Sequence, residues 1–187
     1  HLLACDMELD PTPGYAFTSW ETGYGDLHGV PDLSTLRVAS WLDRTAIAIC
    51  DAHRDAPLGL VSVAPRSILI RQLERVASMG LVAKMGSELE FFLFRDDFDG
   101  ARAKGYRDLT TTQSYIEDYH VLSGTFVESV IGEIRRQMDA SAIPVEFSKG
   151  EWGPGQHEIN LCYAPALEMA DRHVIYKLGA KEIAHRA

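Results

Sequence analysis

The stretch Gly153-Pro154-Gly155-Gln156-His157-Glu158-Ile159-Asn160 joins a tight turn to an alternating strand. Side chains of a strand alternate between two faces, so Gln156, Glu158 and Asn160 share one face. A turn explains the glycines and the proline, but it does not explain three polar side chains on one face of the strand. That face therefore indicates the lining of a site. His157 falls on the opposite, apolar face, where a packed or hydrogen-bonded histidine is expected rather than a metal ligand.

A second alternating stretch lies upstream, at Ser87-Glu88-Leu89-Glu90-Phe91. Glu88 and Glu90 point to one face, which continues with Phe92 and Phe94. Because apolar residues occupy the other face, the strand is expected to be covered on both sides. Two like charges beside aromatic rings would each carry a desolvation penalty of roughly several kcal/mol unless a cation compensates. The alternative is an edge strand whose acids face water.

A fourth carboxylate completes this acidic set. Glu151 lies seven residues before Glu158 and joins it with Glu88 and Glu90. Ligands that are all carboxylates favour hard ions such as Mg²⁺ or Mn²⁺ over Zn²⁺, whose structural sites usually use Cys and His. The sequence therefore predicts a magnesium or manganese site.

Several motifs, in the same order along the chain, resemble those of the glutamine synthetases. They include the E-x-E pair before an apolar strand and V-E-x4-E-x-G-P-G-Q-x-E-I-N at residues 145–160. Upstream, Pro31-Asp32-Leu33-Ser34-Thr35 resembles the P-D-x-S-T segment of that family. Pro65-Arg66-Ser67-Ile68-Leu69 resembles its P-R-x-x-L helix start. The resemblance covers nearly the whole chain.

The resemblance implies a set of metal ligands. Glu90, Glu151 and Glu158 would bind one metal ion, and Glu88 would bind a second ion whose other ligands lie beyond Ala187. The implied cofactors are Mg²⁺ or Mn²⁺, together with ATP.

Two further site residues follow from the same resemblance. Glu146, five residues before Glu151, matches the position that approaches ATP; the alternative is an exposed acid at a strand end. Asp26 matches the aspartate that enters a neighbouring subunit's site, where it helps to bind and deprotonate ammonium; the alternative is an Asp that caps a Gly-rich turn. The chain departs from the family at residues 147–150, where bacterial members often carry histidines, and this affects the expected nucleotide contacts.

The implied activity has two steps. ATP phosphorylates the γ-carboxylate of glutamate, and ammonia then displaces phosphate from the acyl phosphate to form an amide. The S-K-G-E-W-G-P-G-Q form of the motif at residues 148–156 also favours a γ-glutamyl ligase that uses a polyamine or another amine. A third hypothesis is a non-catalytic structural relative, against which the retention of all four carboxylates counts. The family resemblance further implies a ring-shaped homo-oligomer with sites shared between subunits.

Composition limits the partners and the compartment. The formal net charge is −9, from 27 acidic residues against 18 Lys and Arg, which argues against nucleic acid or an anionic membrane as the main partner. The expected partners are small molecules: glutamate, ammonia or an amine, and ATP. The three cysteines are an odd number in no C-x-x-C pair, so they predict thiols in a reducing, cytoplasmic compartment.

The predicted fold class is α+β, with a curved, mainly antiparallel sheet and helices packed on its outer side. Residues 1–60 are expected to be the remnant of a β-grasp-like domain with an active-site loop, and residues 61–187 the N-terminal part of a catalytic domain. The chain begins without Met and stops within a helical stretch, so we expect a fragment that is inactive by itself.

Apolar periodicity predicts the individual elements. Residues 10–35 are expected to form a long loop, and residues 45–51 and 59–63 a hairpin. A helix over 66–79 should follow, then a strand or strand pair over 81–94 that is broken at Gly86, and then a polar loop over 96–112. One long helix is expected over 119–138, with one apolar face formed by Tyr119, Leu122, Phe126, Val130, Ile134 and Met138. Strands over 143–147 and 156–162 should follow, and then a last helix from Pro165 whose apolar face includes Leu167, Val174, Leu178 and Ile183.

Overall fold

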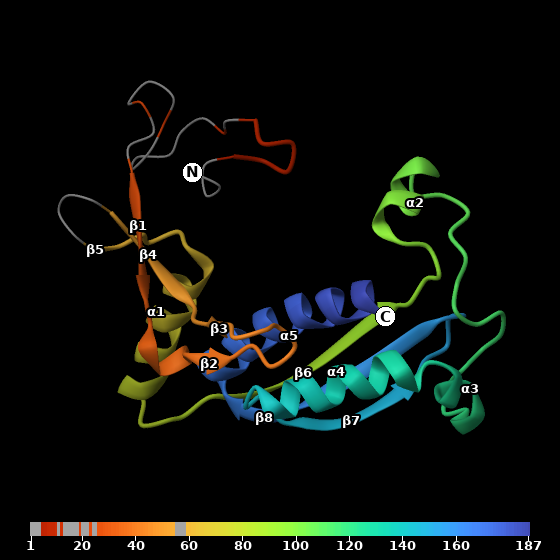
Figure 1. Cartoon of the computed structure of the whole chain (residues 1–187). Helices are drawn as coiled ribbons and strands as arrows, with labels where there is room; N and C mark the ends of the chain where they lie inside the picture. The colour runs from red at the N-terminus through yellow and green to blue at the C-terminus, as the bar shows by residue number, and fades with distance from the viewer. Residues whose placement is uncertain (1–4, 11, 13–18, 20–22, 24–25, 55–58) are drawn as a thin grey trace. The chain divides into compact units, whose positions relative to one another are not determined.

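The computed structural model describes residues 5–10, 12, 19, 23, 26–54 and 59–187. The chain divides into two compact units (Figure 1). One unit holds residues 1–36 and 47–83, and the other holds residues 37–46 and 84–187. Both units contain antiparallel sheets and helices, so the predicted mixture of helix and strand is confirmed.

The larger unit is built on a three-stranded antiparallel sheet in the order β6-β8-β7. Its strands are β6 (Lys84–Phe92), β7 (Val145–Gly150) and β8 (Gln156–Pro165). The last strand of the chain therefore lies between the two earlier ones. All three strands were predicted from the sequence. The pairing of β6 with β8 shifts between Met85 and Ser87, at the predicted break.

The two faces of this sheet differ in their burial. On β8 both faces are buried, with Ile159 and Leu161 on one face and Glu158 and Asn160 on the other, so the difference lies at β6. On the other face, Glu88, Glu90 and Phe92 of β6 are exposed, with Phe92 at 49%. The expectation that this strand is covered on both sides is therefore wrong for the described residues. Alternation fixes which side chains share a face, whereas the cover of a face depends on other elements.

Two helices cover the apolar face. The helices α4 (Glu128–Ala140) and α5 (Ala166–Arg186) contact each other; α5 also contacts β6 and β8, and α4 contacts β7 (Figure 1). Their packing buries Ile134 and Met138 of α4 and Ile175 and Tyr176 of α5 completely. The helices come close at Gly179, where a Cβ would lie 2.7 Å from Met138 Cε.

The long helix predicted over 119–138 is wrong in one respect: it is two helices. The short α3 (Val121–Phe126) ends at Val127, whose φ of −116° interrupts the helix before α4 begins. Leu122 and Phe126 of the predicted apolar stripe, before this break, are exposed, whereas Ile134 and Met138 in α4 are buried and Val130 is half-buried. The stripe continues at helical spacing across the break, so periodicity alone did not reveal it.

Two other elements differ from expectation in detail. The short helix α2 (Phe98–Ala103) lies within the predicted polar loop, where the Asp97 side chain accepts a hydrogen bond from the Gly100 N–H at 2.7 Å. In α5, Val174 and Leu178 were expected in the buried stripe but are exposed. The helix α5 packs on β6, on β8 and on α4. Its buried face is therefore wider than one stripe, and it is centred on other residues than the predicted apolar face.

The smaller unit contains a second antiparallel sheet, in the order β1-β4-β5. Its strands are β1 (Leu27–Pro31), β4 (Cys50–Arg54) and β5 (Gly59–Leu60). A hairpin is present as β4 and β5, but its first strand is Cys50–Arg54 and not the predicted 45–51, whose residues 46–47 form β3 in another sheet. Residues 55–58 lie outside the described part. The strand β1 falls within the predicted long loop, so that prediction is wrong for residues 27–31. The remaining short elements are η2 (Leu33–Thr35), β2 (Arg37–Val38) and β3 (Ala46–Ile47).

The predicted helix over 66–79 is present as α1 (Pro65–Ser78), with proline at its first position. Arg66 in its first turn binds two carboxylates of the same unit: its Nη2 lies 2.7 Å from Asp32 Oδ2 and its Nη1 lies 2.8 Å from Asp51 Oδ1. The P-D-x-S-T and P-R-x-x-L segments are therefore joined directly by an ion pair. Among the described residues, no helix is long and apolar enough to cross a membrane.

Candidate metal centre

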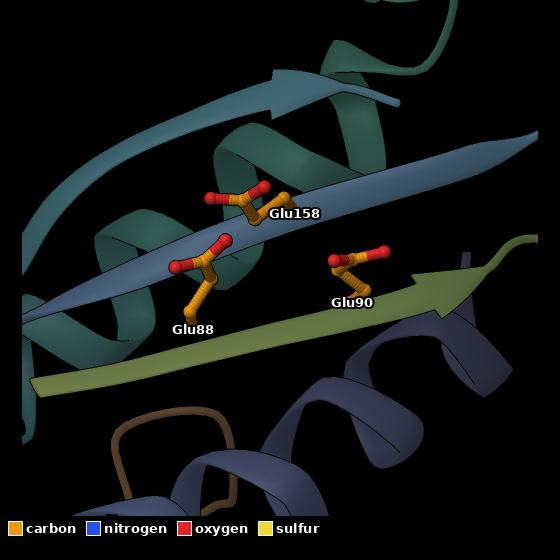
Figure 2. Close-up of side chains that lie close together, drawn as sticks. All are labelled: Glu88, Glu90 and Glu158. Atoms are coloured by element: carbon orange, nitrogen blue, oxygen red, sulfur yellow. The ribbon is translucent and has the colours of Figure 1, made fainter. Parts of the chain in front are cut away.

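Three carboxylates gather on the open face of the larger sheet. Glu88 and Glu90 of β6 and Glu158 of β8 each offer an oxygen, and these oxygens lie within 4.8 Å of one another (Figure 2). Glu158 is only 3% exposed, whereas Glu88 and Glu90 are exposed. The prediction that acids from the two separated strands converge holds for these three residues.

The strand register produces this convergence. Glu90 is the direct partner of Glu158 in the antiparallel pairing of β6 with β8. One step along the same face, Glu88 is the partner of Asn160. Side chains of directly opposed residues lie about 4.5–5.5 Å apart at Cβ, so the sheet itself forces two like charges together.

Two amides of β8 hold these carboxylates in place. Gln156 donates from its Nε2 to Glu90 Oε2 at 2.5 Å, and its Oε1 accepts from the Gly153 N–H at 2.8 Å. Asn160 donates from its Nδ2 to Glu158 Oε1. The polar side chains that the sequence places beside Glu158 therefore orient the acids of the group.

A buried acid holds the turn before β8 through a hydrogen bond. Gly155 has a φ of +76°, which glycine adopts without strain. Its N–H donates to Glu117 Oε1 at 2.8 Å, and its carbonyl accepts from the Leu93 N–H at 2.8 Å. The G-P-G turn is thus tied both to the segment that contains Glu117 and to the end of β6.

Glu117 also meets the buried histidine of β8. Both Glu117 and His157 are at most 1% exposed, and Glu117 Oε2 lies 3.6 Å from His157 Nε2. Burial raises the pKa of the Glu117 carboxyl and lowers the pKa of the His157 imidazole, so both favour their neutral forms. His157 is packed beneath the sheet, as the strand alternation predicts. Glu117 was missed, because it lies in an irregular segment without periodicity or motif.

Glu151 contacts Glu158 but lies outside the three-carboxylate group. It hydrogen-bonds with Glu158 and with Lys149, but it does not belong to the Glu88, Glu90 and Glu158 group. Burial, and then the hydrogen bond with Glu151, raises the pKa of Glu158, whereas the hydrogen bonds with Glu158 and Lys149 lower the pKa of Glu151. The two carboxyls therefore share negative charge unequally, with Glu158 the more readily protonated.

The donor set fits a hard divalent cation. All charged donors are carboxylate oxygens, the type of ligand that Mg²⁺ and Mn²⁺ prefer. The buried Glu158 lies beside Glu88 and Glu90, and Lys149 compensates its charge only in part, from 3.7 Å; burial still raises the pKa of the Glu158 carboxyl. A divalent cation among these oxygens would compensate the remaining negative charge. Glu88, Glu90, Glu151 and Glu158 are thus the residues that could hold metal.

The two remaining predicted site residues lie elsewhere. Glu146 is exposed on β7 and lines a cavity of about 500 Å³ together with Arg135, Arg136 and Asp139 of α4. Asp26 is exposed immediately before β1 and belongs to the smaller unit. Neither is part of the three-carboxylate group.

A comparison with known protein families gives one match to this chain. The sequence model for the glutamine synthetase catalytic domain matches residues 62–187, which include every carboxylate of the candidate metal centre.

Curated relatives and solved structures agree with that match. The chain is 46% identical over 185 residues to a gamma-glutamylethanolamide synthetase of Streptomyces coelicolor, and 35% identical over 185 residues to a glutamate–isopropylamine ligase of a Pseudomonas species. Each alignment covers 98% of this chain but 40% of the relative. A solved GmaS/ADP complex superposes with a TM-score of 0.76 at 26% identity, covering 93% of this chain and 37% of that one.

Proposed function

The chain belongs to the glutamine synthetase family, and from this premise we propose that the full-length protein is an ATP-dependent ligase that joins a small amine to the γ-carboxylate of glutamate. The observation that carries the proposal is the group of Glu88, Glu90 and Glu158 oxygens within 4.8 Å of one another. An acidic group of this kind suits a reaction in which phosphate and carboxylate charges must be brought together.

The choice of amine rests on the relatives. Both relatives described above act on substituted amines, ethanolamine and isopropylamine by their names. Their similarity favours an aliphatic amine as the acceptor over ammonia, which the sequence alone had put first. Glutamine formation from ammonia is the second candidate, because the family model is that of glutamine synthetases.

In the proposed centre, Glu90, Glu151 and Glu158 would hold one divalent metal ion, and Glu88 would contribute a ligand to a second. Ions bound there would supply positive charge for the phosphate groups of the nucleotide. Gln156 keeps the Glu90 carboxylate turned toward the site through its 2.5 Å hydrogen bond. The ADP in the GmaS complex supports ATP as the phosphoryl donor.

Two residues outside the carboxylate group complete the proposal. Glu146 would contact ATP, and Asp26 would bind the protonated amine and accept its proton. The γ-carboxylate of glutamate attacks the terminal phosphorus of ATP and releases ADP. The neutral amine then attacks the acyl carbon of the γ-glutamyl phosphate, and phosphate leaves with its bonding electrons as the amide forms.

We extend the proposal to the organisation of the protein. Residues 1–60 would be the remnant of a β-grasp-like domain, and residues 61–187 part of the catalytic domain, whose sheet would be curved. The start of the family match at residue 62 supports this division. A homo-oligomeric ring and a cytoplasmic location also belong to the proposal, the latter supported by the free thiols of Cys5, Cys50 and Cys162.

The test is a coupled assay of ADP formation by the full-length protein with glutamate, ATP and Mg²⁺. Ethanolamine, isopropylamine and ammonium are supplied in turn, and the product mass is measured. The proposal expects higher kcat/KM with a substituted amine than with ammonium, and loss of turnover in Glu158→Gln but not in Glu133→Gln on α4. Faster turnover with ammonium would favour glutamine synthetase. Absence of turnover with all three amines would favour a non-catalytic relative.

A further inference from the structure

The ammonium group of Lys149 lies among the carboxylates of the candidate metal centre. Lys149 is on β7 and is the direct cross-strand partner of Glu158 on β8. Its Nζ hydrogen-bonds with Glu151 and lies 3.7 Å from Glu158 Oε2. The side chain is only 15% exposed. Glu90, Glu158 and Lys149 are therefore cross-strand neighbours on β6, β8 and β7, so two acids and one cation lie side by side across the sheet.

The same ammonium group has a second set of contacts. Asp118 Oδ1 lies 3.4 Å from Lys149 Nζ, and the ring centroid of Tyr119 lies 4.4 Å from it. A carboxylate and the face of an aromatic ring both attract a cation. Asp118 and Tyr119 thus offer a place for the ammonium group that does not use Glu151 or Glu158.

Lys149 and a divalent ion need the same oxygens. Glu151 and Glu158 are two of the ligands assigned to one metal ion under the proposed function, and both already contact the ammonium group. Two cations in contact with one carboxylate pair repel each other strongly where solvent is largely excluded. Either the ammonium group withdraws when metal binds, or the metal binds weakly.

We propose that Lys149 is a tethered cation that neutralises Glu151 and Glu158 in the metal-free protein and withdraws toward Asp118 and Tyr119 when a divalent ion binds. The inference rests on the metal centre of the proposed function. Lys149 then has two effects. It stabilises the metal-free site by compensating like charges, and it lowers the affinity for metal because its contacts must be broken first.

The test measures Mn²⁺ binding to the full-length protein by isothermal titration calorimetry, and thermal unfolding in EDTA. Lys149→Met removes the charge and keeps the length of the side chain. We expect Lys149→Met to bind Mn²⁺ about tenfold more tightly than the wild type does. In EDTA its unfolding temperature should be lower than that of the wild type, and at saturating Mn²⁺ this difference in unfolding temperature should be smaller. Lys149→Arg keeps the charge and should retain the wild-type unfolding temperature in EDTA.

A second variant predicts a change in the opposite direction. Asp118→Asn weakens the alternative position for the ammonium group, so Mn²⁺ should bind more weakly than in the wild type, whether or not Lys149→Met folds. Unchanged or weaker Mn²⁺ binding in Lys149→Met, or unchanged binding in Asp118→Asn, would overturn the tethered-cation proposal while leaving the ligase intact. Absence of Mn²⁺ binding in the wild type would overturn the metal centre and this inference together.

Discussion

Glu90 on β6 and Glu158 on β8 are direct partners in the antiparallel pairing, so two acids face each other on one side of the sheet. The backbone hydrogen bonds of the ladder fix the pairing of the two residues, and a change of side-chain rotamer does not alter it. Gln156, on the same strand as Glu158, holds Glu90 from the neighbouring position. The geometry of the group thus depends on residues that are not charged.

Gln156→Ala should weaken metal binding without removing a carboxylate. The substitution deletes the 2.5 Å hydrogen bond to Glu90 and the 2.8 Å hydrogen bond from the Gly153 N–H. Loss of a group that orients a ligand typically lowers metal affinity by about 10–100-fold, and we expect a decrease of that size in Mn²⁺ affinity by calorimetry. Gln72→Ala, an exposed position on α1, is the matched control and should bind Mn²⁺ as the wild type does.

Gly150→Ala should destabilise the larger unit. A Cβ at this position would lie 2.6 Å from the Glu117 carbonyl oxygen and 2.8 Å from Glu117 Cβ, so the backbone around Glu117 would have to move. The expected loss is about 1–3 kcal/mol of unfolding free energy, measured by urea denaturation. Gly86→Ala is the control, because a Cβ there meets no atom within 4 Å in the described structure. Equal losses in both variants would contradict the role assigned to the contact.

Glu117 should make the stability of the protein depend on pH. Burial raises the pKa of this carboxyl above its ordinary value of 4.5. At pH values between 4.5 and the raised pKa, Glu117 holds a proton in the folded protein but has lost it in the unfolded chain. The contribution of Glu117 to the free energy of unfolding therefore falls as pH rises through this range. Each pKa unit corresponds to about 1.4 kcal/mol.

The measurement compares Glu117→Gln with the wild type by urea denaturation at several pH values. Gln keeps an oxygen for the Gly155 N–H and does not ionise in this range. The variant should therefore gain stability relative to the wild type as pH rises above 4.5. Glu74→Gln, at an exposed position on α1, is the control. A stability difference between Glu117→Gln and the wild type that is the same at every pH would rule out a titrating Glu117.

Tyr176→Phe should stabilise the protein. Tyr176 is fully buried on α5, and its hydroxyl has no hydrogen-bond partner among the described residues. A buried polar group without a partner costs about 1–3 kcal/mol, so we expect an increase of about 1 kcal/mol in unfolding free energy by thermal or urea denaturation. Tyr163→Phe, at an exposed residue of β8, should change stability by less than about 0.5 kcal/mol. A destabilised Tyr176→Phe would show that the hydroxyl has a partner in solution.

The sequence predicted on which face of its strand each acid lies, but not whether other elements pack on that face. Alternation correctly placed Glu88 with Glu90, and Glu158 with Asn160, because the period of a strand is a local property. It could not show that Phe92 would be exposed, since cover comes from distant elements. For the same reason, periodicity predicted where apolar residues recur near Leu122 but not that the helix there stops at Val127.

The residues that the sequence did not identify act through long-range contacts. Glu117 has no motif around it, and its role depends on a hydrogen bond from Gly155. Lys149 was noted only as a departure from the family pattern. Its place beside Glu158 depends on the register of β7, which shifts between Val145 and Phe147. A one-residue change in register moves a side chain to the other face, so no reading of β7 alone could have placed this cation.

The order of the strands in the larger sheet has a consequence for biosynthesis. The ribosome completes β6 and β7 before β8, yet β8 is the strand that pairs with both. Until Asn160 has left the exit tunnel, each earlier strand has an unpaired edge that can bind another chain. A nascent polypeptide is therefore vulnerable to misassembly up to that point, and a chaperone that shields β6 would be most useful before it.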